Sequence, residues 1–246
     1  MKGKILYLFL SLLISSSCSK SYLKQKADFT HYSLKENTES QSAKIAIAEY
    51  KVKVNAETEK IIGNSTDVLL KDGDESALGN FVCDALKYNA EKEFKNLPVD
   101  VVLINRGGLR TNLPKGNIKV INIFELMPFE NDLILVKISG QKLLEGLQII
   151  FEKRHPFLGL KIKAENNKIT EATINGSSID KEKIYTIVTS DYLAYGGDNF
   201  IFLKEPFTIE KSNLRIRDAI IKYCIFLNEN KKQIIPYIDG RFQISK

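Results

Sequence analysis

The sequence predicts an α+β domain in which helices flank a mixed β-sheet, and three features carry this prediction. A run of β-branched and aliphatic residues at 99–104 (VDVVLI) is typical of a buried strand. Apolar residues recur at helical spacing over 75–94 and 141–154. The turn Asn175-Gly176 separates two extended segments, as in a β-hairpin. The chain shows no internal repeat, so we expect one folded domain.

The remaining elements can be placed in order along the chain. Residues 45–62 favour a helix, although their apolar spacing also allows a strand, and residues 120–126 open a further segment. Short runs of apolar and β-branched residues predict strands at 133–138, 160–162, 169–174 and 185–189. A closing helix is expected at 212–228, with Ser212 as its N-cap.

The N-terminus has the proportions of a secretory signal. A short basic stretch is followed by an apolar run from Ile5 to Ile14, which is too short to span a bilayer. Small residues then directly precede Cys18, which suggests lipoprotein processing with diacylglycerol attached to the Cys18 thiol. Ser15 stands where bacterial lipoprotein signals usually carry Leu, so ordinary cleavage that leaves a free cysteine is the alternative.

These features divide the chain into a signal peptide at 1–17, a lipidated and flexible tether at 18–43 and a folded domain at 44–246. We therefore expect a secreted bacterial lipoprotein, anchored in a membrane and either periplasmic or on the cell surface. The composition, with 43% hydrophobic and 27% charged residues, is that of an ordinary globular protein. The net charge is +6, and the basic residues are spread along the chain without forming an aromatic-basic stripe. Nucleic acid is therefore not an expected partner.

Catalytic metal chemistry within this chain is not expected. The sequence holds two histidines, His31 in the tether and His155 before a proline, and it has no H-E-x-x-H, C-x-x-C or D-x-H pairing. No G-x-S-x-G segment is present either. We therefore assign no catalytic residue and no metal ligand. Cys83 and Cys224 lie in apolar helical contexts, where buried thiols are expected and a disulfide is the alternative.

Three short segments together offer what a nucleotide needs. Residues 105–110 (NRGGLR) follow the strand at 99–104, and they combine glycines that allow close backbone approach with arginines that can hold phosphate. Residues 127–131 (MPFEN) place a Phe and an Asn after a rigid Pro, and residues 192–199 (YLAYGGDN) combine aromatic rings with a diglycine and a carboxylate. Each segment alone is also compatible with an ordinary turn. Together they supply guanidinium groups for phosphate, flat rings for a base and a carboxylate for both ribose hydroxyls.

The same segments resemble the C-terminal, substrate-binding domain of 5′-nucleotidases and related periplasmic nucleotide hydrolases. That family's pattern runs approximately N-x-G-G-x-R, then P-F-x-N, then an aromatic residue, three intervening residues and G-G-D. The corresponding segments here are NRGGLR, PFEN and YLAYGGD, and the upstream ESALGNFVCDAL is similar to the family's segment around L-G-N. The resemblance covers about residues 45–246. It implies a single 5′-nucleotidase C-terminal-like domain.

The resemblance implies a role in base recognition for four positions. Phe129 and Tyr192 would sandwich the base, with Tyr in place of the more usual Phe. Asn131 would hydrogen-bond the base. Backbone near Gly159, in the segment HPFLGLKI, would border it.

The resemblance also implies contacts to the sugar and the phosphate. Asp198 would hold the ribose, and Arg110 would contact the phosphate. Some family members carry further phosphate-binding arginines shortly before the L-G-N segment, where this chain has VLLKDGDESALGN. Arg106 is a possible phosphate contact that would compensate for them. A nucleoside or another phosphorylated ligand is the alternative.

In the family, this domain follows a metallophosphatase domain whose histidines and aspartates hold two metal ions, and hydrolysis takes place between the two domains. Here the expected signal peptide runs almost directly into the C-terminal domain. We therefore expect the nucleotide-binding half of a 5′-nucleotidase-type hydrolase of nucleotide catabolism. Hydrolysis would need a separate metallophosphatase subunit that carries the two divalent metal ions. The alternative is a non-catalytic nucleotide- or nucleoside-binding lipoprotein.

Overall fold

The computed structural model describes residues 40–95 and 97–245. The expected signal peptide, Cys18 and most of the expected tether lie outside these residues. The chain divides into two units, Met1–Ile45 and Ala46–Lys246. Every described element except the first residues of helix α2 (Gln41–Thr58) belongs to the second unit.

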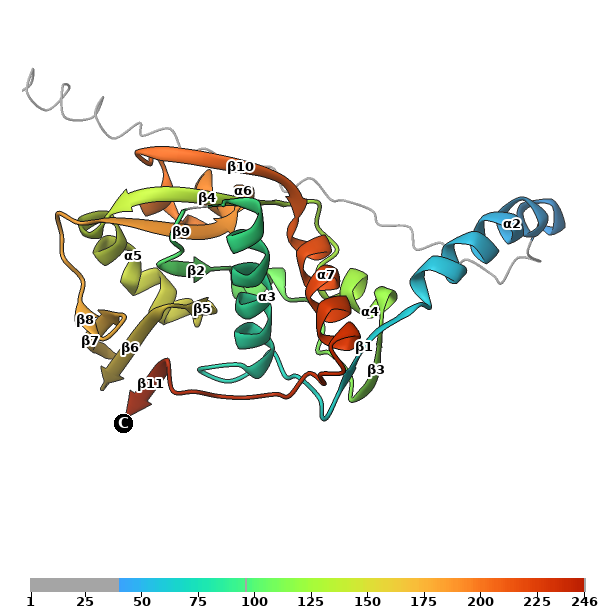
Figure 1. Cartoon of the computed structure of the whole chain (residues 1–246), viewed down its shortest axis with the longest axis horizontal. Coiled ribbons are helices and arrows are strands. Elements are labelled where there is room, and N and C mark those ends of the chain that lie inside the picture. The colour runs from blue at the N-terminus through green and yellow to red at the C-terminus, as the bar shows by residue number, and fades with distance from the viewer. Residues whose placement is uncertain (1–39, 96, 246) are drawn as a thin grey trace, which may run out of the picture. The chain divides into compact units, whose positions relative to one another are not determined.

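A five-stranded mixed sheet forms the centre of the second unit (Figure 1). Its strand order is β10-β4-β9-β2-β5, with β2 parallel to β9 and the other neighbours antiparallel. The strands are β2 (Val101–Leu103), β4 (Asp132–Ser139), β5 (Phe157–Leu158), β9 (Ile184–Ser190) and β10 (Thr208–Arg215). The prediction of an α+β fold with a mixed sheet flanked by helices is therefore confirmed.

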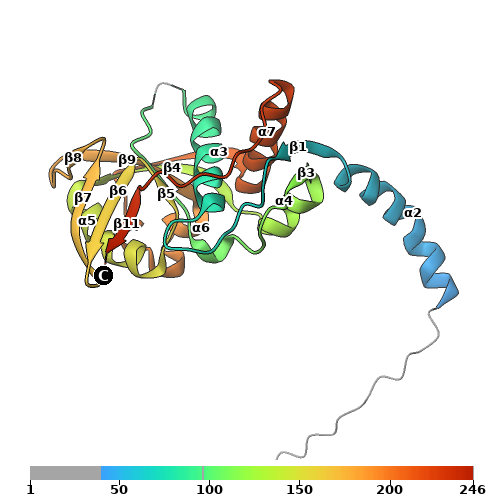
Figure 2. The ribbon, with the colours of Figure 1, turned by 90° about the horizontal axis from the view of Figure 1, so that it is seen from below.

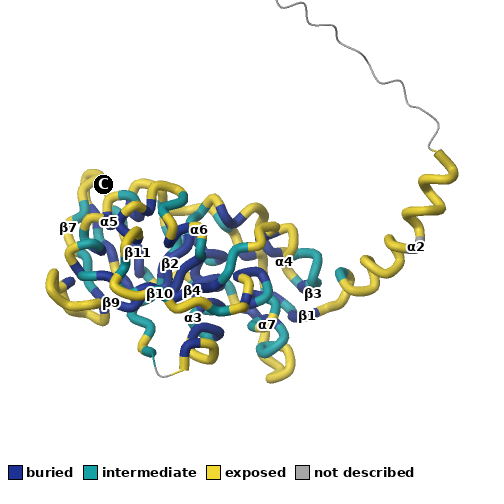
Figure 3. Tube along the Cα trace, turned by 90° about the horizontal axis from the view of Figure 1, so that it is seen from above, coloured by how far each residue is buried: buried dark blue, intermediate teal, exposed yellow. Residues whose placement is uncertain are grey.

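The central strands are buried on both faces, which explains why their sequences read as continuous apolar runs. Successive side chains of a strand point to opposite faces. Accordingly Val102 and Val188 belong to one core, whereas the adjacent Val101 and Ile187 belong to the other. In Figure 3, β2, β4 and β9 carry the dark blue of buried residues.

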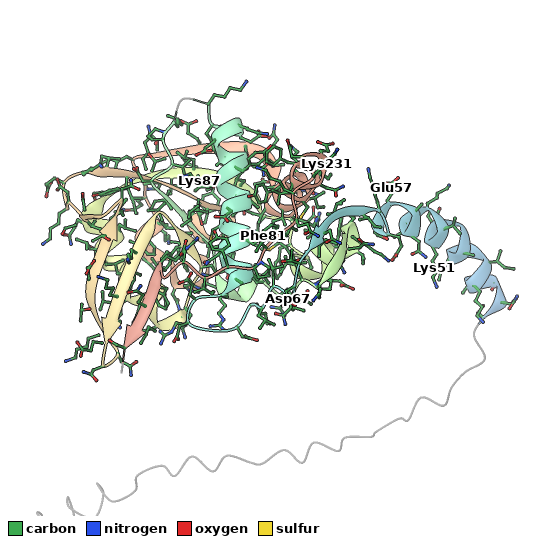
Figure 4. All side chains as sticks on the ribbon, turned by 60° about the horizontal axis from the view of Figure 1, so that its bottom comes forward. Lys51, Glu57, Asp67, Phe81, Lys87 and Lys231 are labelled. Carbon is green, nitrogen blue, oxygen red and sulfur yellow. The ribbon has the colours of Figure 1, made fainter. Side chains whose placement is uncertain are left out.

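Helices cover one face of the sheet, and a second sheet with two further helices covers the other. α3 (Ala77–Glu93) and α7 (Ile216–Glu229) run side by side on the first face together with the short α4 (Val120–Leu126) (Figure 2). Phe81 on α3, labelled in Figure 4, places its ring 5.7 Å from the ring of Tyr223 on α7. The second face packs against α5 (Gly140–Lys153), α6 (Asp191–Ala194) and the second sheet.

The second sheet contains the predicted hairpin. Its strand order is β11-β6-β7-β8, and its strands are β6 (Leu160–Glu165), β7 (Lys168–Ile174), β8 (Ser177–Ser178) and β11 (Phe242–Ser245). Asn175 and Gly176 join β7 to β8 with φ values of 52° and 77°. Two consecutive positive φ angles are what a two-residue hairpin turn requires, so this turn is as predicted.

The segment predicted at 45–62 as a helix, with a strand as the alternative, is helical over most of its length. α2 ends at Thr58, and β1 (Ile61–Ser65) then pairs antiparallel with β3 (Gly116–Lys119). No helix in the described part of the chain combines the length and the apolarity needed to cross a membrane.

The predicted start of the closing helix is wrong. Ser212 lies in β10, and α7 begins only at Ile216. The Ser212 hydroxyl donates to the carbonyl of Leu133 in β4 at 2.6 Å and accepts the N–H of Leu214 at 3.2 Å. Pairing with the sheet therefore determines the local structure, and the preference of Ser for helix N-caps does not.

Both cysteines of the described residues are free and buried. Cys83 lies in α3 and Cys224 in α7. Burial raises the pKa of both thiols, that of Cys224 to about 12. The structure therefore agrees with buried thiols and does not contain the alternative disulfide.

Candidate functional site

The topology brings the three predicted segments to one edge of the central sheet. β2 and β9 are parallel neighbours, so the residues that follow them, NRGGLR and the 192–199 segment, leave the sheet at the same edge. β4 is antiparallel to β9, with Leu133 opposite Ser190. The PFEN segment directly precedes β4 and therefore lies at the same edge of the sheet.

A cavity of about 570 Å³ lies at this edge, which is the size expected for a small-molecule site. Five of the predicted site residues line it: Arg110, Phe129, Asn131, Tyr192 and Asp198. The lining also includes residues outside the three predicted segments, among them Ile104, Ser190 and Ile216. Its walls are therefore partly apolar, with a few convergent polar groups.

The two aromatic rings of the cavity are exposed although both belong to large apolar side chains. Phe129 is 40% exposed and Tyr192 is 44% exposed. Neither ring stacks on another aromatic ring of the described residues. The Tyr192 ring lies directly over Gly197, where a Cβ atom would stand 2.4 Å from a ring carbon, so any larger residue at position 197 would displace the ring. These rings are not core residues; Gly197 packs against the Tyr192 ring, and the Arg110 guanidinium lies 6.0 Å from the centroid of the Phe129 ring.

Asp198 is held at the cavity by its neighbours. Its Oδ1 accepts the Tyr192 hydroxyl at 2.9 Å, and its Oδ2 accepts the Asn105 amide at 2.5 Å. The Asp198 N–H in turn donates to the Tyr192 hydroxyl at 3.2 Å. Asp198 has φ 48° and ψ 33°, a left-handed conformation that is uncommon outside glycine. The hydrogen bond to Asp198 also raises the pKa of Tyr192.

Asn131 is oriented by a neighbouring acid. Its Nδ2 donates to Asp191 Oδ1 at 2.9 Å, and the same oxygen accepts the Tyr192 N–H at 2.7 Å. The Asn131 carbonyl accepts the N–H of Ile216 at 2.9 Å, which fixes the backbone at the start of α7. Both the side chain and the backbone of Asn131 are thus constrained at the cavity wall.

An ion-pair cluster secures the PFEN segment. Glu130 Oε1 accepts a hydrogen bond from Arg217 at 2.7 Å, and Arg215 pairs with Oε2. The Arg217 guanidinium also lies 4.1 Å from the centroid of the Phe124 ring. The hydrogen bond from Arg217 lowers the pKa of the Glu130 carboxyl. Because Glu130 stands between Phe129 and Asn131, these contacts also hold those two residues at the cavity.

A second cavity of about 610 Å³ adjoins the first and is basic. The two share Gly107, Arg110 and Asp198 in their linings. Besides these, the second cavity is lined by Lys71, Arg106 and Lys153, together with Asp72. Arg106 pairs with Asp72 at 3.2 Å. Lys71 Nζ donates to the carbonyl of Arg110 at 3.2 Å.

Lys71 and Lys153 were missed by the sequence reasoning. Lys71 stands in the VLLKDGDESALGN segment, at the place where some family members carry arginines, and its positive charge there is the sequence signal that indicates it. Lys153 ends α5 and has no motif around it, so only the folded chain places it beside Arg106.

His155 also lines the basic cavity and is only 6% exposed. Its Nδ1 accepts the backbone N–H of Arg106 at 3.1 Å, and its ring lies 4.8 Å from that of Phe200. Burial lowers the pKa of His155 to about 4, although Asp198 acts in the opposite direction. The imidazole is therefore neutral at physiological pH and supports the Arg106 backbone as an acceptor.

Gly159 does not lie among the residues that line either cavity. It follows β5 with φ 82°, and a Cβ atom there would stand 2.0 Å from the carbonyl oxygen of Asp100. Close approach of the β2 backbone is thus a sufficient reason for glycine at this position, and the expected border with the base remains a prediction.

The described residues contain no group of three or more His, Cys, Asp or Glu side chains placed to hold a metal ion.

Comparison with known families identifies the family to which this fold belongs. Residues 52–205 match the family described as 5′-nucleotidase, C-terminal domain. This match covers more than half of the chain, and the chain belongs to that family.

Relatives and solved structures extend the comparison. The chain is 27% identical to an apyrase of Tabanus yao over 200 residues, which are 70% of this chain and 36% of the apyrase. It is 27% identical to a 5′-nucleotidase of Vibrio parahaemolyticus over 117 residues, 45% of this chain and 21% of that protein. The fold is similar to that of a 5′-nucleotidase precursor from Thermus thermophilus, with a TM-score of 0.71 and 23% identity over 82% of this chain and 43% of that one. The chain thus spans less than half the length of each.

Proposed function

We propose that this chain is the nucleotide-binding half of a 5′-nucleotidase-type hydrolase of nucleotide catabolism. The observation that carries the proposal is the single cavity in which Phe129, Asn131, Tyr192 and Asp198 meet Arg110. The exposed rings of Phe129 and Tyr192 would stack on the two faces of a base. The Asp198 carboxylate would accept hydrogen bonds from the ribose hydroxyls.

The basic cavity would receive the phosphate. Arg110 belongs to both cavities, so a phosphate beside it would lie at their junction. Arg106, Lys71 and Lys153 would add positive charge around it. Arginine offers paired donors to phosphate oxygens, and lysine acts as a point charge.

Hydrolysis, in this proposal, requires a separate metallophosphatase subunit that carries two divalent metal ions. Such ions activate a water molecule and stabilise the leaving oxygen, and the nucleotide-binding half would orient the substrate toward them. The second candidate is a nucleotide- or nucleoside-binding lipoprotein without an enzymatic partner. The exposed base-stacking rings and the Asp198 network support both candidates equally, and the two differ only in whether a partner completes the site.

For the location of the protein, we propose export and acylation at Cys18. The apolar run from Ile5 to Ile14 and the small residues before Cys18 support this reading. Each buried methylene of an acyl chain contributes roughly 0.8 kcal/mol to membrane binding, so several chains are needed for firm anchoring. Mass spectrometry of the mature N-terminus tests the proposal, and an unmodified Cys18 contradicts it.

A pair of measurements on the purified full chain tests the function. Calorimetric titration with AMP should give saturable binding, and the chain alone should release no phosphate from AMP in the presence of Mn²⁺ or Zn²⁺. Phosphate release should appear when a secreted metallophosphatase encoded beside this chain is added. Binding without any release in the presence of that protein would favour the non-catalytic candidate. Metal-dependent turnover by the rigorously purified chain would contradict the need for a partner.

A further inference from the structure

We infer that the base site selects nucleobases with an amino group in place of a carbonyl at purine C6 or pyrimidine C4, as in adenine and cytosine, and that Asp191 imposes this selection through Asn131. The inference rests on the proposed function, since it takes a base to lie in the cavity lined by Phe129 and Tyr192. It adds the chemical class of base that the site accepts.

The first step is the orientation of the Asn131 amide. Its terminal atoms are a donor nitrogen and an acceptor oxygen, whereas a carboxylate only accepts hydrogen bonds. One terminal atom of Asn131 lies 2.9 Å from Asp191 Oδ1. That atom must be Nδ2, because an amide oxygen there would face a carboxylate oxygen without a hydrogen between them. The chemistry of Asp191 therefore determines the orientation of the Asn131 amide.

The residues on both sides of the contact between Asn131 and Asp191 are anchored by backbone interactions. Asp191 directly follows Ser190, whose side chain accepts the N–H of Leu193 and caps α6. Asp191 itself accepts the N–H of Tyr192 at 2.7 Å. Asn131 is tied through its carbonyl to Ile216. Strand pairing of Leu133 with Ser190 sets the distance between these two anchored positions.

With Nδ2 bound to Asp191, Asn131 presents its amide oxygen to a base in the cavity. Asn131 lines the cavity, and Asp191 is not among the residues that line it. No donor of the described residues bonds to Asn131 Oδ1, so its lone pairs are available. An amino group such as adenine N6 can donate to this oxygen, whereas a carbonyl oxygen at the same place would meet a second acceptor. The negative charge of Asp191 behind the amide adds to this preference.

Matched pairs of nucleotides test the inference. AMP and IMP differ in whether the purine carries an amino group or a carbonyl oxygen, and CMP and UMP differ in the same way in the pyrimidine. Calorimetric titration of the full chain should show AMP binding about tenfold more tightly than IMP, the effect of one net hydrogen bond. CMP should bind more tightly than UMP.

Asp191→Asn tests the role of the acid itself. The new amide can donate as well as accept, so Asn131 is free to turn over and the ratio of IMP to AMP dissociation constants should fall toward one. Asp180→Asn is the matched control, because Asp180 likewise accepts a nearby backbone N–H, that of Glu182 at 3.0 Å, away from both cavities. Its ratio should equal that of the wild type. A melting curve for each variant reports whether the fold is retained.

The outcomes separate this inference from the proposed function. Equal or tighter binding of IMP by the wild-type chain overturns the inference and leaves nucleotide binding intact. If none of the four nucleotides binds at millimolar concentration, both the inference and the proposed function are overturned. A folded Asp191→Asn variant that keeps the wild-type ratio removes Asp191 from the mechanism. Should that variant fail to fold, Asn131→Ala must lower the ratio while the stacking rings still bind AMP, and an unchanged ratio overturns the inference.

Discussion

The Tyr192 hydroxyl donates to Asp198 Oδ1 at 2.9 Å and accepts the Asp198 N–H at 3.2 Å. The two residues therefore form a closed pair of hydrogen bonds across the turn that contains Gly197. A phenylalanine at position 192 would offer the same ring to a base but no hydroxyl to the carboxylate. The tyrosine thus joins the ring proposed to stack on the base to the residue proposed to hold the ribose.

Tyr192→Phe should lower the preference for ribonucleotides over 2′-deoxyribonucleotides while retaining most of the affinity for AMP. The variant retains the aromatic ring, but the Asp198 carboxylate loses the Tyr192 hydroxyl, one of the donors that orient it. Asp198→Asn should lower the same preference, because an amide is a poorer acceptor for two hydroxyls than a carboxylate. Titrations with AMP and dAMP measure both effects. Tyr195→Phe, an exposed tyrosine outside the cavity lining, is the control and should leave the ratio unchanged.

Phe129→Ala and Tyr192→Ala should each weaken AMP binding roughly five- to a hundredfold, because a base–aromatic stack contributes on the order of 1–3 kcal/mol. Their melting temperatures should stay near that of the wild type, since both rings are exposed. Phe200→Ala, which removes a fully buried ring, should instead lower stability. Phe207, 67% exposed and outside the cavity, supplies a neutral control. A large loss of stability in the Phe129 or Tyr192 variants would show that these rings are structural.

Arg110→Ala should penalise AMP roughly ten- to a hundredfold while changing adenosine binding little, because a charged hydrogen bond to phosphate contributes on the order of 1.5–3 kcal/mol. Lys71→Ala should show the same selectivity with a smaller effect, since lysine offers no paired donors. Titration of each variant with both ligands measures the difference. Lys161→Ala on the exposed face of β6 is the control. Equal losses for AMP and adenosine would place Arg110 at the base or the ribose and not at the phosphate.

The unfolding free energy should fall as the pH is lowered from 6.5 toward 4. Burial keeps His155 neutral in the folded chain down to a pKa of about 4, whereas the unfolded chain takes up its proton near the ordinary value of 6.5. Protons therefore bind preferentially to the unfolded state in this interval, and the loss can reach on the order of 3 kcal/mol. His155→Asn should reduce this dependence, because it retains an acceptor for the Arg106 N–H without titrating there. Denaturant unfolding at several pH values gives the comparison, and identical slopes for the two proteins would contradict it.

Local patterns were sufficient to predict most of the fold. The strand around Val102 and the helix around Phe81 were recognisable because burial on both faces or on one stripe leaves a direct trace in the sequence. The Asn175-Gly176 hairpin was recognisable because few residues adopt its backbone angles. Ser212 was misplaced because its local preference for a helix N-cap competes with pairing to β4, a long-range interaction that the sequence does not show.

The lining of the cavity was predictable where its residues stand in contiguous motifs. Phe129, Tyr192 and Asp198 each belong to such a segment, and sheet topology then brings these segments together. The contributions of Lys153 and Asp191 depend on which segments become neighbours in the fold. Asp191 directly precedes Tyr192, yet its importance comes from Asn131, which approaches it only because β4 pairs with β9.

A co-crystal structure of the full chain with AMP tests the central claim most directly. The account predicts the adenine ring between Phe129 and Tyr192, the ribose hydroxyls on Asp198 and the phosphate beside Arg110. The Asn131 amide should retain its hydrogen bond to Asp191. AMP bound elsewhere on the chain, or in this cavity with its base away from both rings, would contradict the account.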